Sequence, residues 1–238
     1  MKDVYQRLAQ IDAGVALDAA TGKGEFINVI KSDFRSYAQI IGVDSSEKSV
    51  SYAQKVFPEN DIEIYRMNLE ELAFENEHFD TVTIANSIHH LENPDKVFVE
   101  LLRVLKPGGL FLVSEMYRDG EQTEAQQTHI MMHHWLSSID RLFGISHRET
   151  YTRDDIHKMI KKLALKKCES FDYYLPVDNP KMNRNCETLL NNCKDGIKRL
   201  EASEASSELI NKGKELIERI NNIGCAGASR VMVLGYKS

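Results

Sequence analysis

The sequence contains few cysteines and prolines, four and five among 238 residues. It has no CxxC pair and no histidine pair at zinc-finger spacing, so a structural zinc site is not expected. Cys186 and Cys193 lie seven residues apart in a helical pattern, about 10 Å along one face, which is too far for a disulfide. We therefore expect reduced thiols in the core at all four positions: Cys168, Cys186, Cys193 and Cys225.

Long apolar runs are also absent. No stretch approaches the ~20 apolar residues needed to cross a bilayer. The first residues carry charges throughout and lack the apolar segment of a secretory signal. These absences predict a protein without a membrane partner, located in the cytoplasm.

Positive charge is not in excess. The chain has 30 Lys and Arg residues against 36 Asp and Glu residues, a formal charge of −6, and its pI is about 5.8. A protein whose main partner is a phosphate backbone normally carries a basic stripe. Nucleic acid is therefore not an expected partner.

The composition is that of a globular protein, with 42% hydrophobic and 28% charged residues. A chain of 238 residues can bury one substantial core. We expect a single domain spanning residues 1–238, with helical insertions at about 118–163 and 178–223.

The segment 15–113 alternates short apolar runs with helical patterns, which indicates an α/β fold with a parallel sheet covered by helices on both faces. Strands are expected at 15–19, 38–43, 62–67, 81–85 and 110–114, and helices near 25–32, 46–57 and 94–105. The last of these helices should end in a turn at residues 106–109, because Lys-Pro-Gly-Gly cannot continue it.

The remaining chain is mainly helical. Further helices are expected at 120–143, 153–163, 182–200 and about 209–220, and strands at 165–174 and 230–236. One apolar stripe should bury four residues of the first helix: Met131, Trp135, Ile139 and Leu142. The helical hairpin at about 180–223 is predicted to pack on the carboxyl edge of the sheet or to form a homodimer. A helical cap favours a small, enclosed substrate.

A strand, a small-residue turn and a helix follow one another in the segment 17–26, LDAATGKGEF. Gly22 and Gly24 allow the backbone to approach a ligand, and the helix start presents free N–H groups. A dinucleotide fingerprint needs a third glycine where Ile27 stands. A nicotinamide-dependent oxidoreductase is therefore the less favoured reading.

Asp44 ends the second expected strand, twenty residues beyond Gly24. A carboxylate at this edge of the sheet can accept both hydroxyls of a ribose. Alternatively, Asp44 is the N-cap of the helix that starts near Ser46, and the two roles are compatible.

Residues 14–116 resemble the class I, Rossmann-like methyltransferases that use S-adenosylmethionine (SAM), of the small-molecule type. The motif around Gly22 and Gly24 is similar to the family's first motif, with Ala20 in place of its usual first glycine. Met67-Asn68-Leu69 resembles the segment that borders the adenine ring, and the LRVLKPGG run at 102–109 resembles a late family motif.

The resemblance implies a mostly parallel seven-stranded sheet with an antiparallel last strand. It also implies SAM as cofactor, S-adenosylhomocysteine as product, and methyl transfer to a small-molecule acceptor that the sequence does not identify. The implied cofactor-binding residues are Asp18, Ala20, Gly22, Gly24, Asp44, Ser45, Met67, Asn68, Leu69 and Asn86. A SAM-binding regulatory protein that transfers no methyl group is the main alternative.

Transfer of an activated methyl group needs alignment of the acceptor more than a metal, although a base helps when the acceptor carries a proton. His89 and His90 follow the fourth expected strand and are candidates for this base, or they shape the substrate site.

Other candidates lie elsewhere in the chain. His129 and His133 stand one turn apart on a helix, on the same face as Asp140, where they could line the acceptor pocket, bind a metal or face solvent. His133 is the third catalytic candidate. Tyr5, in a short N-terminal helix, either covers the substrate pocket or anchors that helix. No metal is expected.

Overall fold

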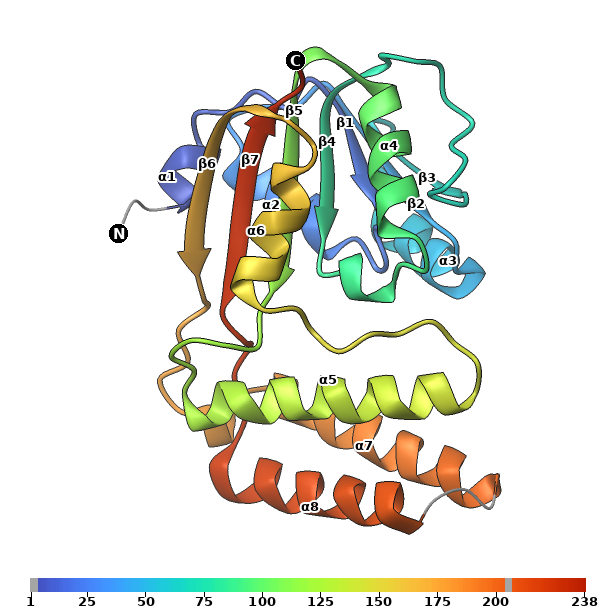
Figure 1. Ribbon diagram of the computed structural model, residues 1–238, viewed down its shortest axis with the longest axis vertical. Coiled ribbons are helices and arrows are strands. Elements are labelled where there is room, and N and C mark those ends of the chain that lie inside the picture. Colours follow the sequence, from blue (N-terminus) through green and yellow to red (C-terminus); the bar gives the residue numbers. More distant parts are fainter. Residues whose placement is uncertain (1–3, 204–206) are drawn as a thin grey trace. The chain divides into compact units, whose positions relative to one another are not determined.

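A computed structural model describes residues 4–203 and 207–238. The strands form one seven-stranded sheet in the order β3-β2-β1-β4-β5-β7-β6 (Figure 1). Their bounds are β1 Val15–Ala19, β2 Gln39–Asp44, β3 Ile62–Arg66, β4 Phe79–Ala85, β5 Leu105–Met116, β6 Lys166–Tyr173 and β7 Arg230–Tyr236.

The strands from β1 to β5 are parallel where they pair. In contrast, the start of β5 bonds to the residue after the end of β7: Gly108 donates to the Lys237 carbonyl at 3.0 Å, and Lys237 donates to the Gly109 carbonyl at 3.0 Å. β7 is therefore antiparallel. The expected mostly parallel seven-stranded sheet with an antiparallel last strand is confirmed.

The chain divides into two compact units. The sheet unit contains Met1–Glu115, Ile156–Asp172 and Val231–Ser238, and the helical unit contains Met116–Asp155 and Tyr173–Arg230. Each unit has its own buried residues. The single domain expected from the sequence stays a prediction.

The sheet unit contains the helices of the strand–helix repeats that the sequence indicates, together with further helices. They are α1 Val4–Leu8, α2 Glu25–Asp33, α3 Glu47–Val56, the 3-10 turn η1 Ile88–His90, α4 Pro94–Val104 and α6 Arg153–Lys161, whose first residues belong to the helical unit. Ser46 is the N-cap of α3, because its side chain accepts from the Ser49 N–H at 3.3 Å. Pro94 begins α4, a position where its missing N–H costs nothing.

The Lys-Pro-Gly-Gly segment does not form the turn that the sequence predicted. β5 begins at Leu105, directly after α4, and its pairing with β4 shifts from Phe79↔Leu105 to Thr81↔Leu110. The intervening residues bulge beside Asp80, which bonds to Lys106 at 2.6 Å. Positive φ at Gly108 (73°) permits this bulge while the segment remains in the sheet through its bonds to the C-terminal residues.

The helical unit consists mainly of α5 Glu124–Leu142, α7 Asn185–Ala202 and α8 Ser207–Ile223, with the 3-10 turn η2 Pro180–Met182. Its core contains Trp135 and Ile139 of the stripe predicted for α5, but Met131 and Leu142 are 47% and 53% exposed. The buried stripe instead includes Met132, so Met131 lies one residue, about 100°, away from it. Leu142 is the last residue of the helix.

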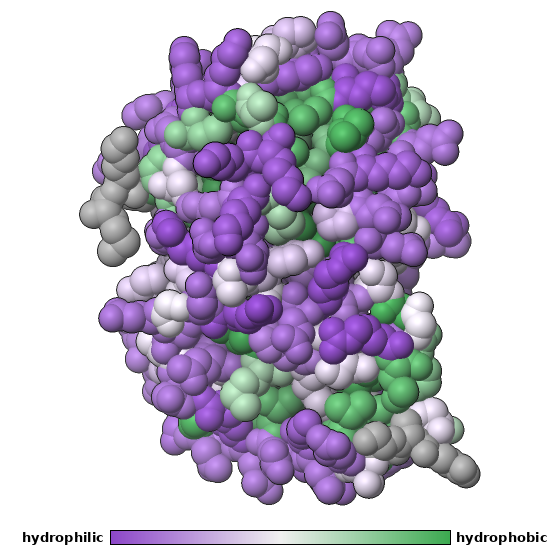
Figure 2. Space-filling model, viewed as in Figure 1, coloured by the Kyte–Doolittle hydropathy of each residue, from purple (hydrophilic) through white to green (hydrophobic). Residues whose placement is uncertain are grey.

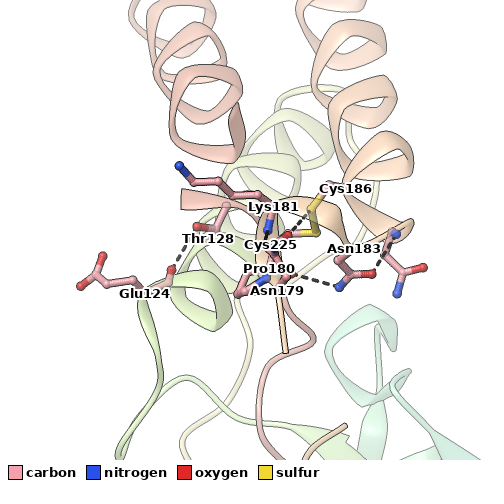
Figure 3. Close-up of a disulfide and its surroundings, with 9 residues drawn as sticks. Glu124, Thr128, Asn179, Pro180, Lys181, Asn183, Cys186 and Cys225 are labelled. Atoms are coloured by element: carbon pink, nitrogen blue, oxygen red, sulfur yellow. Dashed lines mark hydrogen bonds between the residues drawn. A yellow bond between two sulfur atoms is a disulfide. The ribbon is translucent and has the colours of Figure 1, made fainter. Parts of the chain in front are cut away.

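The expectation of four reduced core thiols is wrong. Cys186 and Cys225 form a disulfide with Cα atoms 5.6 Å apart (Figure 3). They are 39 residues apart, and the α7–α8 hairpin brings the start of α7 to the residues that follow α8. Of the two free cysteines, Cys193 is buried as expected, whereas Cys168 is exposed.

Hydrophilic residues dominate the face shown in Figure 2, where hydrophobic residues gather in limited patches. None of the helices in the described ranges is long and apolar enough to cross a membrane.

Candidate functional site

The loop between β1 and α2 has a left-handed backbone at three positions. Ala20, Gly22 and Gly24 have φ values of 53°, 56° and 84°. A Cβ on Gly24 would lie 2.1 Å from the ring of Phe57, so both conformation and packing require glycine there. Ala20 adopts the same region with a Cβ, at the position where the resemblance expects glycine.

Asp44 fixes this loop against the end of β2. Its Oδ2 accepts from the Gly22 N–H at 2.8 Å, and its Oδ1 accepts from the Ser46 N–H at 2.8 Å. The proposed N-cap role of Asp44 is wrong, because Ser46 is the N-cap of α3. Each carboxylate oxygen has a further lone pair, so Asp44 can still accept from a ligand hydroxyl.

A cleft of about 720 Å³ opens at the carboxyl ends of the strands in the sheet unit. Seven of the residues predicted to bind the cofactor line it: Ala20, Gly22, Asp44, Ser45, Asn68, Leu69 and Asn86. This volume is within the usual range for small-molecule sites.

The other three predicted cofactor residues support the cleft without lining it. Asp18 is buried beneath the loop, and Gly24 faces Phe57. Met67 bonds through its N–H to the Asp44 carbonyl at 3.0 Å.

Several lining residues were not predicted from the sequence: Ser46, Ser49, Glu70, Ser87, Leu91, Glu92, Asn93 and Val97. Two signals could have found most of them. Ser46 and Ser49 immediately follow Asp44 at a helix start, and residues 87–93 follow β4 at the sheet edge where ligands of such folds bind.

The charge of the cleft is one-sided. Its lining contains the carboxylates Asp44, Glu70 and Glu92, while no lysine or arginine of the described ranges is among its lining residues. Glu70 is paired with Lys96 at 3.0 Å, so part of this negative charge is compensated. Such a lining favours a cationic ligand over an anionic one.

Asn86 presents an unusual polar group to this cleft. It has a positive φ of 49°, a region that asparagine tolerates better than most residues. Its buried Oδ1 has no hydrogen-bond partner among the residues that the structure describes. A buried carbonyl oxygen of this kind is suited to accept a hydrogen bond from a ligand.

Asp18 holds the loop from below. It is 1% exposed and accepts from the Thr21 hydroxyl at 2.6 Å and the Thr83 hydroxyl at 2.9 Å. Burial raises the pKa of Asp18 to about 6, with a smaller contribution from the Asp44 carboxylate, although both hydroxyl bonds oppose the shift.

The two histidines after β4 occupy different environments. His90 is exposed and lines the cleft, whereas His89 is 1% exposed. The His89 Nδ1 lies 3.1 Å from Oε1 of Glu115, which the sequence reasoning missed. The two imidazole rings contact each other, with centroids 4.2 Å apart.

The remaining candidates are divided between the units. Tyr5 lies on α1 of the sheet unit and is 39% exposed. His129 and His133 contact each other on α5 of the helical unit, with ring centroids 4.7 Å apart, and His129 Nδ1 accepts from the Ala228 N–H at 3.1 Å. The acceptor pocket predicted from these three residues stays a prediction.

Asp140 contacts two side chains outside the His129–His133 pair. Its Oδ2 bonds to His147 at 2.8 Å and its Oδ1 to Arg199 at 2.7 Å. Both carboxylate oxygens are therefore bonded to other side chains, and the roles considered for His129 and His133 stay predictions.

Comparisons with known proteins find similarity in part of the sheet unit. Residues 17–113 match the family model of a methyltransferase domain. A protein of Mycolicibacterium smegmatis described as a "probable S-adenosylmethionine-dependent methyltransferase" is 38% identical over 112 residues, 47% of this chain and 42% of that protein. The ubiquinone/menaquinone biosynthesis C-methyltransferase UbiE of Brucella abortus is 36% identical over 104 residues, 42% of this chain and 39% of that protein.

These matches span less than half the length of either relative. The YcgJ protein of Bacillus subtilis shares the fold over nearly the whole chain, with a TM-score of 0.61, 19% identity and coverage of 98% of this chain and 96% of that one. The family match therefore concerns the part of the chain that carries the cleft. Residues 17–113 are therefore similar to a methyltransferase domain, and the relative from Mycolicibacterium smegmatis is described as dependent on S-adenosylmethionine.

Proposed function

We propose that this protein is an enzyme that binds SAM in the cleft of the sheet unit and transfers its methyl group to a small-molecule acceptor by in-line displacement. S-adenosylhomocysteine is the product. The observation that carries this proposal is one cleft lined by Asp44, Asn68, Asn86 and the loop at Ala20–Gly22. It lies at the carboxyl edge of the sheet, where the strand order changes direction between β1 and β4.

The residues present fit this cofactor. SAM carries a sulfonium and an ammonium group. The cleft offers the carboxylates of Asp44 and Glu92 together with Oδ1 of Asn86, which has no hydrogen-bond partner among the described residues. The pyrophosphate of a nicotinamide dinucleotide would face the same carboxylates without a lining cation. The charge of the cleft therefore disfavours the oxidoreductase reading.

The roles of the residues follow from their places. Asp44, held by the N–H groups of Gly22 and Ser46, would accept the ribose hydroxyls, and Asn68 and Leu69 would border the adenine. When bound, SAM supplies a methyl group that is already activated for attack. His90, which lines the cleft, would accept a proton from an acceptor hydroxyl or amine.

A small-molecule acceptor is supported by the relatives, since UbiE is named for ubiquinone and menaquinone biosynthesis. Roles of Tyr5, His129 and His133 in binding the acceptor remain predictions. The cytoplasmic location, the homodimer and the absence of a nucleic-acid partner expected from the sequence remain predictions.

Calorimetric titration of the purified protein with SAM, S-adenosylhomocysteine and NADH tests the proposal. We expect the two adenosyl ligands to bind and NADH not to bind. An acceptor screen that detects S-adenosylhomocysteine formation then separates an enzyme from a SAM-binding regulatory protein. Binding of NADH alone would favour the oxidoreductase, and binding of no ligand would contradict the proposal.

A further inference from the structure

Glu115 is a carboxylate buried in an apolar strand. It lies near the end of β5 between buried residues and has 0% exposure. Moving an ionised carboxylate out of water is strongly unfavourable unless specific partners compensate for the lost hydration. The contacts of Glu115 must therefore compensate for its burial.

Both carboxylate oxygens of Glu115 contact the segment that follows β4. Oε2 accepts from the Ile88 N–H at 2.9 Å, and Oε1 lies 3.1 Å from His89 Nδ1. Ile88 and His89 belong to η1, the 3-10 turn at the carboxyl edge of the sheet. One side chain from β5 thus holds both the backbone of this turn and the ring of its second residue.

These contacts determine the tautomer of His89. An ionised carboxylate only accepts hydrogen bonds, so the proton between Oε1 and Nδ1 resides on the imidazole. A carboxylate at one ring nitrogen fixes both the orientation of a histidine and its tautomer, leaving the other nitrogen as the basic one. His89 is therefore held as the Nδ1–H form.

The fixed ring of His89 supports the ring of His90. Their centroids are 4.2 Å apart and their planes are inclined by 41°. His90 is the histidine that lines the cleft. A continuous set of contacts consequently leads from the Glu115 carboxylate through His89 to the imidazole at the ligand site.

We propose that Glu115 is a positioning residue for the acceptor side of the cleft: by fixing η1 and the tautomer of His89, it sets the orientation of the His90 ring. This inference rests on the proposed methyltransferase function. In that reaction an acceptor X–H loses its proton to His90 while its electron pair forms the X–CH₃ bond and the S–CH₃ bonding pair passes to sulfur.

Imidazole ¹⁵N–¹H correlation spectra of the wild-type protein and of Glu115→Gln test the inference directly. The His89 signals are identified by their loss in His89→Gln. We expect wild-type His89 as the Nδ1–H tautomer. In Glu115→Gln the amide carbonyl can accept from Ile88 and the amide N–H can donate to Nδ1, so His89 should change to the Nε2–H tautomer.

Activity gives the second readout. Glu115→Gln should lower kcat by roughly 10- to 100-fold, the usual cost of losing a group that orients a functional histidine, while the Kd for SAM changes by less than about twofold. Glu100→Gln is the matched control, since Glu100 also accepts from one backbone N–H, that of Leu72, and pairs with one side chain, Arg103. It should leave both kcat and the His89 tautomer unchanged.

Several outcomes would overturn the inference. Finding His89 of the wild-type protein in the Nε2–H form would overturn it, even if the Glu115→Gln protein did not fold. If that variant folds, an unchanged His89 tautomer or an unchanged kcat would also overturn it. A wild-type protein that binds no SAM would overturn the proposed function and the inference together. SAM binding combined with an unaltered Glu115→Gln spectrum would overturn the inference alone.

Discussion

Asp18 couples the stability of the glycine loop to pH. Its carboxyl group is buried and bonded to two hydroxyls, and burial raises its pKa to about 6 from an ordinary value of 3.8. A raised pKa in the folded state means that folding favours the protonated form. Protonated Asp18 therefore contributes its full share to the free energy of unfolding below about pH 4, and this contribution is lost as the pH rises through about 6.

Asp18→Asn should remove this pH dependence, because asparagine cannot ionise. Between pH 4 and pH 7, the unfolding free energy of the wild-type protein should fall by about 2 to 3 kcal/mol relative to that of Asp18→Asn. Urea denaturation at several pH values measures the difference. Parallel pH profiles for the two proteins would contradict the prediction.

Asp80→Asn is a control in which the effect on stability should depend on pH in the opposite direction. Burial acts to raise the pKa of Asp80, but the ion pair with Lys106 and the N–H of Val15 hold it below its ordinary value. The stabilisation from Asp80 is thus present above that value and is lost as the pH falls. The difference between wild-type and Asp80→Asn stability should shrink toward acid pH, whereas the Asp18→Asn comparison changes in the other direction.

Asp44 contributes to ligand affinity through its charge as well as its geometry. Asp44→Ala should weaken SAM binding by about 1.5 to 3 kcal/mol, the value of charge-assisted hydrogen bonds to the ribose. Calorimetric titration measures this change. Asp44→Asn can keep one bond to the loop through its carbonyl oxygen and should lose less affinity. An unchanged Kd in Asp44→Ala would remove Asp44 from the cofactor site.

At the scale of elements, the helices of the helical unit pack closely around one indole. Trp135 on α5 donates from Nε1 to the Leu209 carbonyl at 2.8 Å. A Cβ on Gly213 of α8 would lie 2.5 Å from this ring, and one on Gly196 of α7 would lie 2.6 Å from it. These two glycines thus give the indole its space between the helices.

Gly213→Ala should therefore destabilise the protein although alanine favours helices. In an open helical position the change would stabilise by up to about 1 kcal/mol. Here the added methyl group collides with Trp135 and should cost about 1 to 3 kcal/mol. Denaturation followed by the fluorescence of the single tryptophan measures both the stability and the displaced ring. Asn211→Ala, at an exposed position of α8, is the control and should not destabilise.

The disulfide lies entirely within the helical unit. It joins residues 39 apart, and Asn183 donates to the Cys225 carbonyl at 3.0 Å beside it (Figure 3). Closing a loop of this length stabilises a folded state by about 3 to 4 kcal/mol in the chain-entropy description. Its removal therefore perturbs one unit selectively.

Reduction of the disulfide tests the single domain expected from the sequence. If the two units unfold together, calorimetry should show one transition whose Tm falls on addition of dithiothreitol. Two transitions, of which only one shifts, would contradict a single cooperative domain. Without reductant, the Tm of Cys186→Ser should already be lower than that of the wild type, and dithiothreitol should not change it. Thiol counting should find two free cysteines in the wild type before reduction.

Local patterns in the sequence determined much of the sheet unit. Residues 17–26 form a strand, a glycine turn and a helix in that order, and an acidic residue ends the next strand. These features depend on residues close in the chain, and parallel strands bring such segments to one edge of the sheet. For this reason Gly22, Asp44 and Asn86 could be assigned to one site before any tertiary contact was known, and the structure places all three on the cleft.

Contacts between distant segments could not be predicted from the sequence and are known from the tertiary structure alone. The Cys186–Cys225 disulfide, the bonds of Glu115 to η1 and the bulge of β5 beside Asp80 all depend on how separate elements pack. Periodicity reports which face of a helix or strand is apolar, but it does not report which partner that face meets. Pairing, register and burial of polar groups are therefore determined by packing, because their free energy arises between segments that the chain separates.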